Sequence, residues 1–238
     1  MFWHYLLSAV PLALFILLLL VLDSFSLTKW STLLYSIGAG VVMCLLSRLI
    51  CRIPFIGESK LAVSAVEELC KGAVLYLLIV RHVVGLLGDA TIYGSAIGAG
   101  FGLASNILYL ATHDGALVMH TLFLGLEAAV MHIGTTSTLA MALIMVRQGR
   151  FGDTPRRKHI GVAVAFLAAI LIHYLHALEL INPVILTLLL VAYFIYSKRS
   201  LFRKNERFVH DWLDEGINNE ITLMSALQRG EFSSTPAG

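Results

Sequence analysis

Long apolar stretches cover most of this chain and constrain its fold more than any other feature. A helix needs roughly 20 predominantly apolar residues to cross the hydrocarbon core of a bilayer. The chain has seven candidates: residues 2–22, 33–50, 61–80, 91–111, 122–145, 160–181 and 183–196. Hydrophobic residues make up 58% of the chain and charged residues only 13%, about half the charged share of a soluble domain. We therefore expect an all-α, polytopic membrane helix bundle of about seven transmembrane helices, of which the seventh is the shortest.

The composition changes near residue 200 and divides the chain into two predicted regions. Residues 1–200 hold the apolar stretches, whereas residues 201–238 form a polar tail in which apolar residues recur at near-helical spacing. This spacing predicts one or two short amphipathic helices, which would lie on the cytoplasmic leaflet or pack against the bundle. The last residues of the tail are expected to be disordered.

Basic residues cluster in two loops and set the predicted orientation. They follow the fifth and seventh stretches: Arg147, Arg150, Arg156, Arg157 and Lys158, then Lys198, Arg199, Arg203, Lys204 and Arg207. Cytoplasmic loops are enriched in Lys and Arg, so both loops are expected in the cytoplasm. The N-terminus then lies outside and the C-terminus inside, in a multi-pass protein of the cell membrane. Arg48, Arg52 and Lys60 fall on the outer side and run against the rule.

The third apolar stretch contains a charged cluster. Lys71 follows Glu67 by four residues and Glu68 by three, so all three side chains crowd one side of a helix. Each charge inside a membrane span costs at least about 2.5–3.5 kcal/mol and is by default paired or functional. The lysine can neutralise one carboxylate and leave the other as a general base or acid. The alternative is a buried ion-pair network that only sets helix packing.

Histidines on the fifth and sixth stretches provide further candidates. His132 precedes Thr136 by four residues, and His173 and His176 lie three apart near the end of the sixth stretch. At 1.5 Å per residue, Glu67 and His176 lie about 8–9 Å from the outer ends of their helices, and His132 about 15 Å. Since successive helices alternate direction, all fall in the outer half of the bilayer. We expect one shared cavity there, with His132 and His176 within a side chain's reach of the acids.

The fourth stretch predicts close helix packing next to that cavity. Three glycines lie four residues apart: Gly94, Gly98 and Gly102. Small residues at this spacing let membrane helices approach each other closely. Close approach would bring Asn106, about 8 Å from the outer end of its helix, up to the acids of the third stretch. Ser105 is expected to face the same cavity, with Phe101 one turn before it.

These residues, in this order, resemble the PrsW family of intramembrane proteases, which are relatives of the membrane CAAX-processing proteases. Four segments carry the resemblance: Glu67-Glu68 with Lys71 is similar to the family's EExxK motif, residues 93–109 to its glycine-rich GFxxxEN segment, His132 with Thr136 to HxxxT, and His176-Ala177-Leu178 to HALxN. The similarity spans roughly residues 11–180. It implies cleavage of a peptide bond in or near the membrane, on the extracytoplasmic side where the substrates are anti-sigma factors.

Two positions depart from the family's motifs. Ser105 stands where GFxxxEN has Glu, and Leu180 stands where HALxN has Asn. If the family's Glu activates water or binds a metal, the exchange implies an impaired enzyme or a pseudoprotease that still binds substrate. If the acid pair supplies the base, activity survives. A non-catalytic membrane binding protein or small transporter is the competing class, because the same polar cluster can bind a peptide, a proton or an ion.

The leading interpretation is an intramembrane endopeptidase that acts on membrane-anchored proteins. Glu67 or Glu68 activates water, while His132 and His176 orient it, stabilise the oxyanion or hold a metal. Glu67, His132 and His176 could hold zinc with a fourth position left for water, although the chain has no HExxH motif. The residues expected to line the site are Lys71, Phe101, Ser105, Asn106, Thr136 and His173. The expected partners are a membrane protein or peptide substrate and the bilayer, since a net charge of +2 offers no basic surface for nucleic acid.

Overall fold

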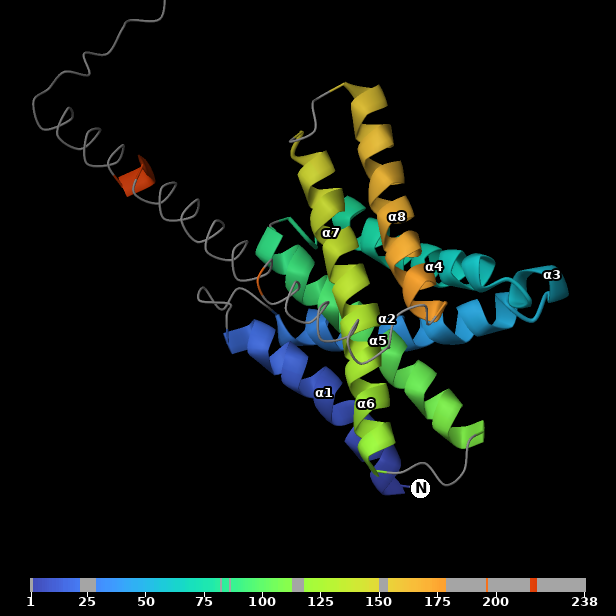
Figure 1. The fold of residues 1–238 in the computed structure, drawn as a ribbon. Helices are drawn as coiled ribbons and strands as arrows, with labels where there is room; N and C mark the ends of the chain where they lie inside the picture. Colours follow the sequence, from blue (N-terminus) through green and yellow to red (C-terminus); the bar gives the residue numbers. More distant parts are fainter. Residues whose placement is uncertain are drawn as a thin grey trace, which may run out of the picture.

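The fold was determined as a computed structural model, which describes residues 2–21, 29–81, 83–85, 87–112, 118–149, 154–178, 196 and 215–217. Within these ranges the secondary structure is entirely helical (Figure 1). The elements are α1 (Phe2–Val21), α2 (Trp30–Ile50), α3 (Pro54–Gly57), α4 (Lys60–Val80), α5 (Leu87–Thr112), α6 (Val118–Ala128), η1 (Ala129–Ile133), α7 (Gly134–Arg147) and α8 (Pro155–Ala177). The expectation of an all-α membrane protein is confirmed.

Among the described residues, four helical segments are long and apolar enough to cross a membrane. They are Trp30–Ile50, Leu87–Thr112, Val118–Arg147 and Pro155–Ala177, while α1 contributes a shorter apolar helix over Trp3–Leu18. Helix α4 has the length of a span, but its apolar sequence is interrupted by the charged cluster at 67–71. The expected seventh helix and most of the polar tail lie outside the described residues. The count of about seven spans is therefore not confirmed, and the membrane orientation stays a prediction.

Helix α5 is the centre of the bundle, because it packs against α1, α2, η1 and α7. Small residues make these contacts close. A Cβ added at Gly98 would collide with the backbone of His132, and one added at Gly100 would collide with the carbonyl of Ile37. The expected close approach of α5 to the following long helix is thus confirmed. A second close contact, with α2, lies on another side of α5 and does not belong to the predicted glycine row.

Helix α4 packs against α2, α7 and α8 and is held at both ends by polar contacts. At its start, Ser59 Oγ accepts a hydrogen bond from the Ala62 amide, and Lys60 Nζ donates to the Ala177 carbonyl at the end of α8 (2.8 Å). At its other end, Arg147 donates to the Ile79 carbonyl (2.8 Å). The start of α4 and the end of α8 therefore lie together, which sets the register of the acids and the histidines.

Candidate active site

The charged cluster of α4 is buried inside the bundle. Glu67 is 4% exposed, and Glu68 and Lys71 are fully buried. Lys71 Nζ donates to Glu68 Oε1 at 2.6 Å, so the lysine neutralises the acid three residues before it and leaves Glu67 to other partners. Lys71 Nζ also lies 5.0 Å from the centre of the Phe101 ring on α5, a favourable cation–π position.

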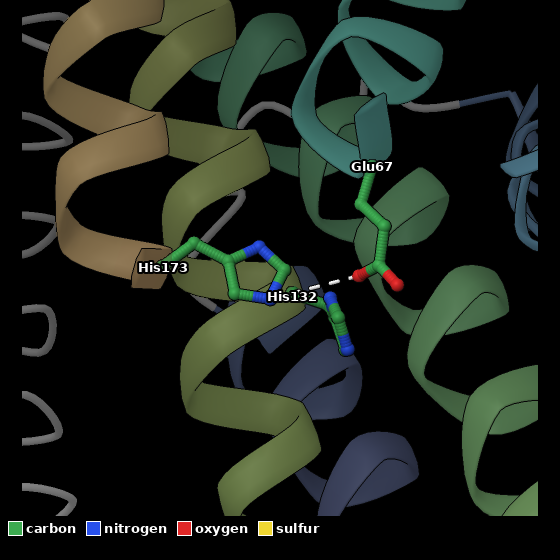
Figure 2. A group of neighbouring side chains, drawn as sticks. All are labelled: Glu67, His132 and His173. Carbon is green, nitrogen blue, oxygen red and sulfur yellow. Dashed lines mark ion pairs between the residues drawn. The ribbon is translucent and has the colours of Figure 1, made fainter. Parts of the chain in front are cut away.

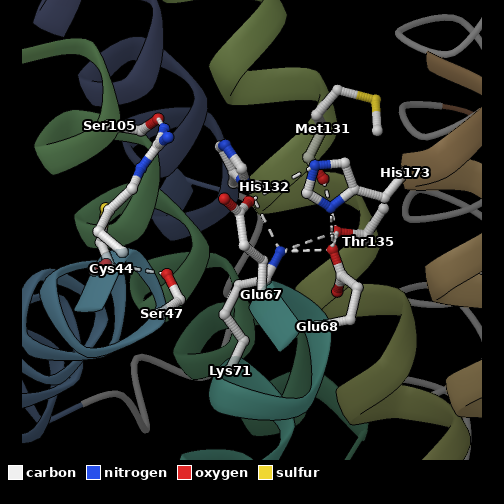
Figure 3. A network of polar contacts seen from close by, with 11 residues as sticks. Cys44, Ser47, Glu67, Glu68, Lys71, Ser105, Met131, His132, Thr135 and His173 are labelled. Atoms are coloured by element: carbon white, nitrogen blue, oxygen red, sulfur yellow. Dashed lines mark hydrogen bonds and ion pairs between the residues drawn. The ribbon is translucent and has the colours of Figure 1, made fainter. Parts of the chain in front are cut away.

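His173 of α8 joins the two acids. Its Nδ1 lies 2.8 Å from Glu68 Oε1, and its Nε2 lies 3.6 Å from Glu67 Oε2 (Figure 2). Each ring nitrogen thus faces a different carboxylate. Figure 3 shows His173, Lys71 and Thr135 directed at Glu68. The sequence placed His173 among the residues lining the site, whereas the structure makes it the histidine in direct contact with both acids.

His132 lies on η1, a short π-helical turn in the middle of the long helix formed by α6, η1 and α7. Such turns insert one extra residue and occur often at functional sites. The His132 ring packs against Phe101 with centroids 4.9 Å apart and edge-on against His173 at 5.4 Å. Its Nδ1 lies 3.4 Å from Lys71 Nζ. Two neighbouring rings and the lysine therefore fix the position of this imidazole.

Thr135 is a site residue that the sequence analysis missed. Its hydroxyl donates to the Met131 carbonyl (2.6 Å) and lies 3.2 Å from Glu68 Oε1. Thr136, which the family motif singles out, is fully buried, and its Oγ1 has no hydrogen-bond partner among the described residues. The π turn changes which face of the helix each residue occupies, and such an insertion leaves no clear signal in the sequence.

Three donors meet at one point, as a metal site requires. Ligand atoms of Glu67, His132 and His173 all lie within 4.8 Å of one another (Figure 2). Two imidazoles and one carboxylate form a common ligand set of catalytic zinc sites. Glu68 contacts the other ring nitrogen of His173. A carboxylate in this position usually orients a ligating histidine. The residues therefore fit a divalent metal ion.

The third donor differs from the one expected, because His173 takes the place assigned to His176. His176 lies in the last turn of α8, one turn further toward the end of the helix. His173 therefore lies one turn deeper in the bundle, where Glu67 and His132 meet. The motif that carries the resemblance begins at His176 and therefore does not include His173, three positions earlier.

Ser105 on α5 lies one helical turn after Phe101, which packs against His132, and Asn106 follows Ser105 directly. Ser105 Oγ accepts a hydrogen bond from Arg48 Nη2 of α2 (3.1 Å). Asn106 is buried, and its Nδ2 has no hydrogen-bond partner among the described residues. The sequence analysis assigned Arg48 no role beyond its charge. As an ionisable residue within an apolar stretch, it met the same criterion that singled out Glu67.

Comparison with known protein families identifies a match over most of the chain. The sequence model of the family described as PrsW family intramembrane metalloprotease matches residues 2–197 of the chain. Searches of curated proteins and of solved structures found no match. The matched range contains every residue of the cluster described above.

Proposed function

The chain belongs to the PrsW family of intramembrane metalloproteases, and we propose that it is an endopeptidase that hydrolyses peptide bonds of membrane-anchored proteins. Anti-sigma factors and similar single-pass proteins are the substrate class that the family implies. The proposed site is the cluster of Glu67, Glu68, His132 and His173, in the outer half of the bilayer. The N-terminus is proposed to lie outside and the C-terminus in the cytoplasm.

The observation that carries the proposal is the pair of contacts made by His173. When Nδ1 donates its proton to Glu68 Oε1 at 2.8 Å, the neutral ring has a lone pair on Nε2, which faces Glu67 Oε2 at 3.6 Å. Two acceptors that face each other need a cation or a proton between them. The charges support the same conclusion, because among the described residues the two buried carboxylates have only one buried cation beside them, Lys71. A metal ion held by Glu67, His132 and His173 supplies the missing positive charge.

We propose zinc as this metal. When bound, it would polarise a peptide carbonyl and lower the pKa of a bound water toward neutrality. The two-histidine, one-carboxylate set leaves a fourth position open for water or substrate. Water activation does not rest on the metal alone, since Glu68 Oε2 is buried without a hydrogen-bond partner among the described residues. That oxygen is the acceptor we propose for the proton of the attacking water.

The remaining residues hold this arrangement in place. Lys71 pairs with Glu68, and Glu68 in turn accepts from His173 and orients its ring. Phe101 packs against His132 and offers its face to Lys71. Residues proposed to line the path of the substrate are Ser105, Asn106, Thr136 and His176. The polar tail, residues 201–238, is proposed to be a separate cytoplasmic region.

Cleavage of defined membrane segments tests the proposal. The purified chain is incubated in vesicles with a library of single-pass segments, and products are mapped by mass spectrometry. Cleavage is expected with zinc and should be lost in Glu67→Gln and in His173→Gln, because each change removes one proposed ligand. Glu58→Gln is the matched control, since Glu58 is exposed in the turn before α4. Binding of segments without any cleavage would instead favour a pseudoprotease or a membrane binding protein, the alternative that Ser105 supports.

A further inference from the structure

Arg48 lies near the end of α2, and its exposed side chain reaches across to α5. Its guanidinium donates to Ser105 Oγ (3.1 Å). A cation close to the end of a membrane helix usually extends toward the membrane surface. Arg48 is held against α5 by its hydrogen bond to Ser105, while part of its side chain stays exposed.

The partners of Arg48 do not neutralise its charge. Ser105 offers a neutral hydroxyl, while the acids of the cluster have other partners. Among the described residues, Glu68 pairs with Lys71 and with His173, and Glu67 pairs with His173. A guanidinium has five N–H donors, so donors remain for a further acceptor.

Arg48 is also close to the reacting centre. Its partner Ser105 lies one helical turn after Phe101 on α5, and the Phe101 ring packs 4.9 Å from that of His132. The guanidinium therefore borders the cluster on its α2 side. A peptide bound at Glu67 and His132 would pass within reach of it.

We propose that Arg48 determines substrate specificity by binding a carboxylate of the peptide. The carboxylate is either an acidic side chain beside the scissile bond or the terminal carboxylate that cleavage creates. Arg binds carboxylates through two parallel hydrogen bonds. The Ser105 hydroxyl positions the guanidinium through a hydrogen bond but does not neutralise its charge. An acid at position 105 would instead pair with Arg48 itself. The inference rests on the proposed function for its substrate class, but peptide binding tests it separately.

Binding of matched peptides to the full chain in detergent micelles is the test. Fluorescent single-pass peptides carry either Glu or Gln at successive positions around a central segment. The unaltered chain should bind the best Glu peptide about 10- to 100-fold more tightly than its Gln counterpart, as a charged hydrogen bond of this kind implies. Arg48→Gln should abolish the preference and Arg48→Lys should keep part of it. Ser105→Glu should also abolish it, because the new carboxylate occupies Arg48.

Arg52→Gln is the matched control, because Arg52 is an exposed cation one turn further along the chain. Its preference for the Glu peptide should equal that of the unaltered chain. Equal preference in Arg48→Gln and the unaltered chain would overturn the inference, and so would an equal loss in Arg52→Gln. Each variant must still bind the Gln peptide normally, which shows that it is folded.

A second arm separates the two sources of the carboxylate. Short peptides ending in a free carboxylate or in an amide compete with the fluorescent peptide. Tighter competition by the free carboxylate, lost in Arg48→Gln, assigns the terminal carboxylate, and equal competition assigns the side chain. A preference for the Glu peptide without any hydrolysis would contradict the proposed function and support the role of Arg48. Hydrolysis without a preference for the Glu peptide would support the proposed function and contradict the role of Arg48.

Discussion

Replacing Lys71 by Met should destabilise the fold by about 3–5 kcal/mol, the usual cost of leaving one member of a buried ion pair alone. Lys71 and Glu68 are both fully buried and lie 2.6 Å apart. Met fills a similar volume but carries no charge. Glu68 would keep only its contacts with His173 and Thr135, which do not replace an ammonium group.

Thermal unfolding in detergent, followed by the loss of helical circular dichroism, measures this cost. At about 2–4 °C per kcal/mol for a chain of this size, the midpoint should fall by about 6–20 °C. Adding Glu68→Gln removes the stranded charge and should recover at least about half of the loss. Arg156→Met is the control, because Arg156 is exposed. A single variant that melts with the unaltered chain, or a double variant no more stable than the single one, would refute the reasoning.

Two further substitutions follow from the packing around α5. Gly98→Val should destabilise the fold by about 1–3 kcal/mol and weaken metal binding, because a Cβ at Gly98 collides with the backbone of His132. Gly38→Val is the control and should have neither effect, because a Cβ at Gly38 meets nothing within 4 Å. Ser105→Glu should raise the rate of hydrolysis of peptides without acidic residues in the mass-spectrometric assay, because it restores the family's acid beside Arg48. Equal rates in the unaltered chain, Ser105→Glu and Ser105→Ala would show that position 105 has no part in catalysis.

Much of the fold could be predicted because the length of an apolar stretch directly indicates a membrane-spanning helix. Stretches at 33–50, 91–111, 122–145 and 160–181 each correspond to a long apolar helix with ends close to those expected. The charged cluster was visible for the same reason, since three charges inside an apolar stretch are costly and stand out. The glycines of α5 were visible through their spacing, although only the structure shows a second close contact at Gly100.

The contacts within the site could not be predicted. Lys71 lies within helical reach of both acids, and spacing alone does not decide that it binds Glu68. His173 and His176 are both on α8, and the depth of each in the bundle depends on where the helix ends against α4. The π turn that carries His132 has no sequence signal, and it also brings Thr135 to Glu68.

The central claim is that Glu67, His132 and His173 form one metal site, and zinc binding to the purified chain tests it most directly. Metal content and affinity are measured by mass spectrometry and competition with a chelating dye. The unaltered chain should bind one zinc ion, and His173→Gln should lose most of that affinity. Glu68→Gln should lose about 10- to 100-fold through the orientation of His173, while His176→Gln should bind as the unaltered chain does. Full zinc binding by His173→Gln, or its loss in His176→Gln, would contradict the account.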